Sequence, residues 1–132
     1  MRPGIAWLRV SYWIGAVVDG AMIVALLSPS VGAALLGLTD FHPGPEYRYA
    51  TALAASLMAG WTALLVWADR KPVERRGVLL LTICPVLLGL MASGGYAVAS
   101  GLVAAQKMGP TWALQLALVV IFSVSYVRAG SG

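Results

Sequence analysis

The sequence has little charge for its length and very few of the side chains that hold metals or haem. Of its 132 residues, 11% are Asp, Glu, Lys or Arg, whereas a water-soluble domain carries about 25%. The single cysteine, Cys84, excludes an internal disulfide and dithiol chemistry. The single histidine, His42, excludes a bis-histidine haem held by this chain alone and argues against an all-protein zinc site. We therefore expect no cofactor and no metal.

Hydrophobic residues are abundant instead. They make up 60% of the chain, and the mean hydropathy is +0.84. Such a chain has too few polar side chains to cover a surface that faces water, so the lipid bilayer is its natural solvent. A net charge of +4 would suit either nucleic acid or a membrane. The positions of the basic residues, given below, favour the membrane and no nucleic-acid partner.

Four segments have the roughly 20 mostly apolar residues that a membrane-spanning helix needs. A short interfacial or re-entrant helix follows the first of them, with Ser28 as its cap and Pro29 in its first turn. Pro110 suits the first position of the last helix. We predict an all-α, polytopic membrane protein, a four-transmembrane-helix bundle forming a single membrane domain over residues 1–132. The predicted spans are residues 10–27, 49–67, 77–98 and 111–127, with the short helix at about 30–38.

The distribution of Lys and Arg predicts the orientation. With four spans, both termini and the loop between the second and third spans share one side, which holds seven of the nine basic residues. The other side holds Arg48 and Lys107. The positive-inside rule then places both termini in the cytoplasm, in a bacterial inner membrane. The first apolar run is about 18 residues long, longer than a signal-peptide core, so we expect an uncleaved span. The seven basic residues on the side of the termini are Arg2, Arg9, Arg70, Lys71, Arg75, Arg76 and Arg128.

The first span, "SYWIGAVVDGAMIVALL", carries Asp19 in its middle. At about 1.5 Å per residue, Asp19 lies roughly 15 Å deeper than Arg9, near the midplane of the bilayer. A carboxylate there costs about 2.5 to 3.5 kcal/mol, and no Lys, Arg or His stands at that depth. We hypothesise that Asp19 is protonated at rest or binds a cation or cationic ligand. The alternative is a neutral acid hydrogen-bonded within the bundle.

The neighbours of Asp19 at helical spacing include Tyr12, and Ala16 and Gly20 form a pair of small residues. Because such a pair lets another helix approach, we expect Asp19 to face the bundle. Ser56 and Trp61 on the second span are its candidate partners at similar depth.

Three further side chains are candidates for a ligand site. Trp61 is too deep for an interfacial belt, so it forms either the wall of an apolar pocket or a core aromatic whose indole N–H meets a carbonyl. Tyr96 and Gln115 are polar handles for a ligand or interhelical hydrogen-bonding residues.

The remaining features are weaker signals. The run "RKPVERR" either docks anionic lipid or a partner protein through Arg70, Lys71, Arg75 and Arg76, or fixes topology. Pro85 frees a backbone carbonyl in the third span, which we expect the Thr82 hydroxyl to satisfy. The loop "DFHPGPEY" holds Asp40, His42 and Glu46, but its prolines and the absence of a second cluster argue against a metal site.

The layout resembles that of the DoxX-like small four-helix membrane proteins. The resemblance rests on the chain length, the break at Pro29, the glycine in "AGWTALLVWA" and the basic turn "RKPVERR". It implies a four-helix membrane fold. Because some members are subunits of membrane oxidoreductase complexes and many have no known role, it implies no catalytic residue.

Three functions remain open. The first is an accessory or interaction subunit, or an apolar-ligand-binding bundle without chemistry of its own, acting as a homo-oligomer or in a larger membrane complex. The second is a proton-linked small-molecule transporter that uses Asp19, although the seven-to-two charge bias disfavours dual-orientation transporters. The third is a membrane enzyme acting on a lipid or sterol-like substrate, for which Asp19 is the only acid at depth.

Overall fold

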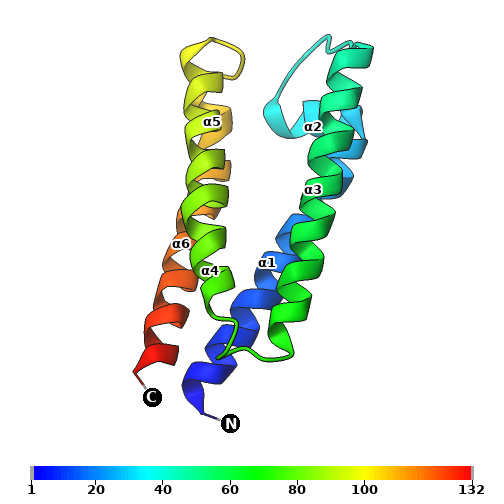
Figure 1. Ribbon diagram of the computed structural model, residues 1–132. Helices are drawn as coiled ribbons and strands as arrows, with labels where there is room; N and C mark the ends of the chain where they lie inside the picture. The colour runs from blue at the N-terminus through cyan, green and yellow to red at the C-terminus, as the bar shows by residue number, and fades with distance from the viewer. Residues whose placement is uncertain (1, 132) are drawn as a thin grey trace.

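The computed structural model describes residues 2–131, which fold into a bundle of long helices (Figure 1). Over this part of the chain, four helices are long and apolar enough to cross a membrane, as predicted. The chain is thus an all-α, multi-pass membrane protein. The four are α1 (Pro3–Leu27), α3 (Pro45–Asp69), a composite third span from Gly77 to Ala99, and α6 (Ala105–Gly130). The third span consists of α4 (Gly77–Leu81), the π-helix η1 (Thr82–Leu87) and α5 (Leu88–Ala99).

The short helix α2 (Pro29–Leu36) follows α1 and packs back against it. A Cβ atom added to the buried Gly32 would lie 3.0 Å from the carbonyl oxygen of Ala25. The helix ends at Gly37, whose φ of 65° is a left-handed conformation that suits glycine. Ser28 occupies the N-cap position, but the predicted capping hydrogen bond is absent there, because the Ser28 hydroxyl bonds to that of Ser30 at 3.2 Å.

Three prolines stand at the starts of helices, but Pro110, which we predicted to do the same, does not. Pro3, Pro29 and Pro45 stand in the first turn of α1, α2 and α3, where a backbone N–H would have no partner. The prediction that Pro110 begins the last helix is wrong, because α6 begins at Ala105 and Pro110 lies inside it. Its position in the second turn removes only one hydrogen bond of the ladder, close to the helix end.

The long helices form two pairs. The first is α1 with α3, which is the most extensive contact in the molecule, and the second is the third span with α6. Figure 1 shows the pairs joined at one end and diverging toward the other. We call the joined end the hairpin end, because the Arg70–Arg76 hairpin lies there beside the described ends of the chain, and the opposite end the loop end.

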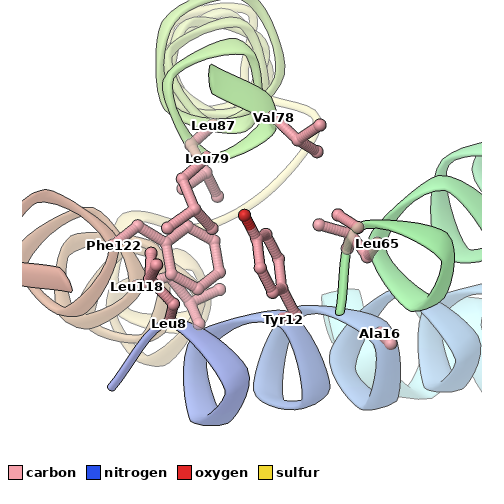
Figure 2. Close-up of a cluster of buried hydrophobic side chains, with 10 residues drawn as sticks. Leu8, Tyr12, Ala16, Leu65, Val78, Leu79, Leu87, Leu118 and Phe122 are labelled. Atoms are coloured by element: carbon pink, nitrogen blue, oxygen red, sulfur yellow. The ribbon is translucent and has the colours of Figure 1, made fainter. Parts of the chain in front are cut away.

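A hydrophobic core joins the two pairs near the hairpin end (Figure 2). The ring of Tyr12 lies in its middle, with Leu65 of α3 on one side and Phe122 of α6 on the other. The Tyr12 hydroxyl reaches past the core and donates to the carbonyl of Pro72 at 3.1 Å. The other members labelled in the figure are Leu8, Ala16, Val78, Leu79, Leu87 and Leu118, and Ala68 completes the cluster.

Polar contacts reinforce the same end. The guanidinium of Arg9 holds Asp69 at the end of α3 in a two-point ion pair, with Nε–Oδ1 at 2.8 Å and Nη2–Oδ2 at 3.0 Å. The indole N–H of Trp13 donates to the same carboxylate. Between α1 and α6, the buried hydroxyls of Ser11 and Ser125 are hydrogen-bonded at 2.6 Å. Bidentate geometry of the Arg9 type is the strongest form of side-chain ion pair.

One close approach of α1 to its neighbours occurs at Gly15. Of the small pair predicted to allow such an approach, Ala16 is buried in the core, whereas Gly20 makes no close contact. A Cβ atom at Gly15 would lie 3.0 Å from Leu65 Cδ1 and 3.2 Å from Phe122 Cζ, whereas one at Gly20 would meet nothing within 4 Å. The two pairs diverge toward the loop end, so Gly20, further along α1, lies beyond the tight contact.

We expect Gly15→Val to lower the free energy of unfolding by about 1 to 3 kcal/mol, because its methyl groups overpack the site between Leu65 and Phe122. Gly20→Val is the matched control on the same helix, with an expected change within about 0.5 kcal/mol. Unfolding by dodecyl sulfate in maltoside micelles, followed by tryptophan fluorescence, measures both. Equal losses in the two variants would contradict the packing described here.

Candidate functional site

A cavity of about 100 Å³ lies between the two helix pairs, directly on the loop-end side of the core. Three core residues, Leu87, Leu118 and Phe122, form its floor. Such a volume holds several water molecules or the head of a small ligand. Its full lining is Gly15, Val18, Asp19, Met22, Met58, Thr82, Val86, Leu87, Leu90, Thr111, Leu114, Gln115, Leu118 and Phe122.

Asp19 and Gln115, which both line this cavity, each have a buried polar atom without a hydrogen-bond partner within residues 2–131. Asp19 Oδ2 on α1 and Gln115 Oε1 on α6 are both buried and both lack a hydrogen-bond partner among the described residues. An unsatisfied buried polar group costs about 1 to 3 kcal/mol. The prediction that Asp19 faces the bundle is therefore confirmed, and its companion is Gln115 on the fourth span.

The two candidate partners from the second span lie elsewhere. Ser56 is exposed, and its hydroxyl donates to the carbonyl of Ala52 in its own helix at 3.0 Å. Trp61 packs against the core and contributes nothing to the cavity wall. The expectation that either residue meets Asp19 is wrong, because Ser56 faces away from the bundle and the Trp61 indole turns toward Thr82.

Trp61 acts on the cavity indirectly, through Thr82. Its indole N–H donates to the Thr82 hydroxyl at 3.1 Å, where we expected a carbonyl, and that hydroxyl donates to the carbonyl of Val78 at 2.7 Å. The expectation that the Thr82 hydroxyl satisfies the carbonyl freed by Pro85 is therefore wrong. The wider π-helical turn of η1 accommodates Pro85 instead.

The other predicted site residues lie away from the cavity. Tyr12 belongs to the core, and its hydroxyl points to the hairpin. Tyr96 is exposed, with 75% of its surface accessible, so it faces the surroundings of the bundle. In the helical stretch 93–96 that precedes the end of α5, the close contact occurs at Gly94, where a Cβ atom would lie 2.8 Å from Trp112 Nε1.

Most basic side chains of the hairpin contact other groups of the same chain. Arg75 donates to the carbonyl of Trp67 and stacks on that ring at 3.3 Å, and Arg76 lies over the ring of Tyr126 at 5.2 Å. Lys71 pairs with Glu74 at 3.0 Å. Arg70 lines a surface hollow beside them.

The loop that contains Asp40, His42 and Glu46 forms no metal cluster: within residues 2–131, no group of three His, Cys, Asp or Glu side chains could hold a metal ion. His42 Nδ1 lies 3.2 Å from the carbonyl oxygen of Asp40 in its own loop.

The sequence reasoning missed Thr111, Met58 and the role of Thr82 in the cavity. Helical spacing in the sequence could have predicted Thr111. Thr111, Gln115, Leu118 and Phe122 recur at intervals of four, three and four, so they share one face of α6. Met58 had no such signal, because its neighbours on α3 are equally apolar.

The chain matches no protein-family model, no curated protein and no solved structure.

We expect Trp61→Phe to lower the free energy of unfolding by about 0.5 to 1.5 kcal/mol more than Trp112→Phe does. Both changes remove an indole N–H, but that of Trp61 is bonded to Thr82 while that of Trp112 is buried without a partner in the described chain. Chemical unfolding of the two variants in the same micelles gives the difference. A larger loss for Trp112→Phe would contradict these assignments.

Proposed function

We propose that this chain is an intramembrane binding protein for a small amphiphile that carries a protonated amine. The observation that carries the proposal is the pair of unpartnered acceptors, Asp19 Oδ2 and Gln115 Oε1, in one cavity. Two acceptors in one cavity call for a ligand with at least two N–H donors. The carboxylate adds a requirement for positive charge, since no cation of the chain lines the cavity within the described residues.

The apolar walls support an amphiphile over water as the occupant. A buried water needs two to four polar partners. Asp19, Gln115 and Thr111 supply enough partners for a water, but a water would make no favourable contact with the mostly apolar remainder of the lining. An ammonium head between the two acceptors would donate hydrogen bonds to them. Its hydrocarbon chain would contact the apolar side chains of Met22, Met58 and Leu90.

Binding is favoured over catalysis and over a larger assembly for a chemical reason. General acid–base chemistry on a lipid would use a second titratable group near the first, and Asp19 is the only one in the described lining. An accessory-subunit role does not account for two unpaired acceptors inside the chain's own cavity.

We further propose that the protein lies in the bacterial inner membrane with its hairpin end and both termini in the cytoplasm. The seven-to-two distribution of basic residues supports this orientation. A relation to the DoxX-like proteins is likewise a proposal, supported by the sequence of four spans with a short helix after the first.

We expect octylammonium to bind the purified protein in maltoside micelles, and Asp19→Asn to weaken this binding about 10- to 100-fold. The amide removes the charge and one acceptor while keeping the shape of the side chain. Gln115→Leu should weaken binding about tenfold. Isothermal titration calorimetry measures each dissociation constant, and proton release during the titration would further indicate a proton-linked transporter.

Three controls make the result specific. Ser56→Ala changes an exposed hydroxyl at similar depth and should leave octylammonium binding unchanged. Octyltrimethylammonium keeps the charge without N–H donors, and octanol keeps the chain without the charge, so both should bind more weakly. Equal binding of octanol, or an unchanged dissociation constant in Asp19→Asn, would refute the proposal.

A further inference from the structure

Two of the surface hollows at the hairpin end contain more than one basic residue, and their charges differ. The first, of about 450 Å³, contains basic residues that are largely neutralised within the chain. Arg9 pairs with Asp69 at 2.8 Å, and Lys71 pairs with Glu74 at 3.0 Å. A hollow with two carboxylates in its lining is a poor site for an anion.

The second hollow, of about 410 Å³, forms where the two described ends of the chain meet. Arg2 comes from the residue before α1, while Arg128 and Ser131 come from the end of α6 and the residue after it. Within residues 2–131 its lining includes no carboxylate. The remainder of the lining is largely apolar, with Pro3, Ile5 and Val73.

Arg128 keeps its hydrogen-bonding edge available. Its guanidinium lies over the ring of Trp7 at 5.4 Å from the ring centroid. Such a cation–π contact uses the face of the planar group, whereas the N–H donors lie along its edge and match the oxygens of a phosphate. The same contact places the site at the level of an interfacial tryptophan, where lipid headgroups lie.

We propose that this second hollow binds the phosphate of an acidic phospholipid headgroup. Arg2 and Arg128 supply charge-assisted hydrogen bonds, and the apolar residues accept the glycerol region. A lipid is favoured over a free anion because apolar Pro3, Ile5 and Val73 line the same hollow, and because the Trp7 contact sets it at the membrane surface. This site lies at the hairpin end and is independent of the amine site around Asp19.

The test is lipid binding by two variants that lose the same charge. Dioleoyl phosphatidylglycerol is titrated into the full chain in maltoside micelles, and bound lipid is counted by native mass spectrometry. We expect Arg2→Gln/Arg128→Gln to weaken binding on the order of tenfold or more. The matched control, Arg70→Gln/Lys71→Gln, should retain most of it. Each double variant keeps five of the seven basic residues at the hairpin end, and the loop end still has two. The charge difference that sets the membrane orientation is therefore kept.

Additional measurements distinguish an acidic lipid from a neutral lipid and from a free anion. Dioleoyl phosphatidylcholine should bind more weakly than the acidic lipid. Sodium phosphate should fail to displace the bound lipid, and displacement would overturn the lipid assignment in favour of a free anion. If the glutamine pair does not fold, Arg2→Lys/Arg128→Lys keeps the charge but removes the planar fork, and an intermediate loss is expected. Equal losses in the Arg2/Arg128 and Arg70/Lys71 variants would refute a specific site.

Discussion

Inside a bilayer, a polar atom that finds no partner within the protein finds none at all, and this constraint governs the whole molecule. The helices satisfy their own backbones, and most buried hydroxyls have partners: Ser11 bonds to Ser125, and Thr82 bonds to Val78. Against that background, three side-chain atoms of the described residues are exceptions: Trp112 Nε1, which belongs to no residue of the cavity lining, and the two acceptors that share the cavity, Asp19 Oδ2 and Gln115 Oε1. Each carries a cost of about 1 to 3 kcal/mol that the fold must tolerate. A ligand that supplies donors to both acceptors would recover much of their cost, which is why their shared cavity is the strongest functional feature.

The packing explains how the fold tolerates this cost. The strong contacts gather at the hairpin end, where the core around Tyr12, the Arg9–Asp69 ion pair and the close approach at Gly15 hold the two helix pairs together. Toward the loop end the pairs diverge, and the cavity lies directly beyond the core. One end of the bundle therefore supplies stability, while the space next to it remains open to the proposed ligand. A tighter bundle would bury Asp19 against apolar side chains without relief.

The sequence predicted the four spans because length and hydropathy alone determine them, and the small residues around Asp19 predicted its inward direction. It did not predict which side chain Asp19 would meet. Ser56 and Trp61 share its depth, but depth does not fix rotation about the helix axis, and rotation turns Ser56 outward while bringing Gln115 inward. The helix start at Ala105 was missed for a related reason, since Pro110 is compatible with either the first or the second turn.

The most direct test of the Asp19–Gln115 site is the distance between ligand nitrogen and carboxyl carbon. The chain has three aspartates, Asp19, Asp40 and Asp69, so labelling aspartate with ¹³C at the carboxyl carbon gives a small set of resonances. Solid-state NMR dipolar recoupling with [¹⁵N]octylammonium in lipid bilayers then reports which carboxyl lies beside the amine. We predict dephasing of one aspartate signal that is missing in Asp19→Asn and weakened in Gln115→Leu. Dephasing confined to Asp40 or Asp69, or none at saturating ligand, would contradict the account.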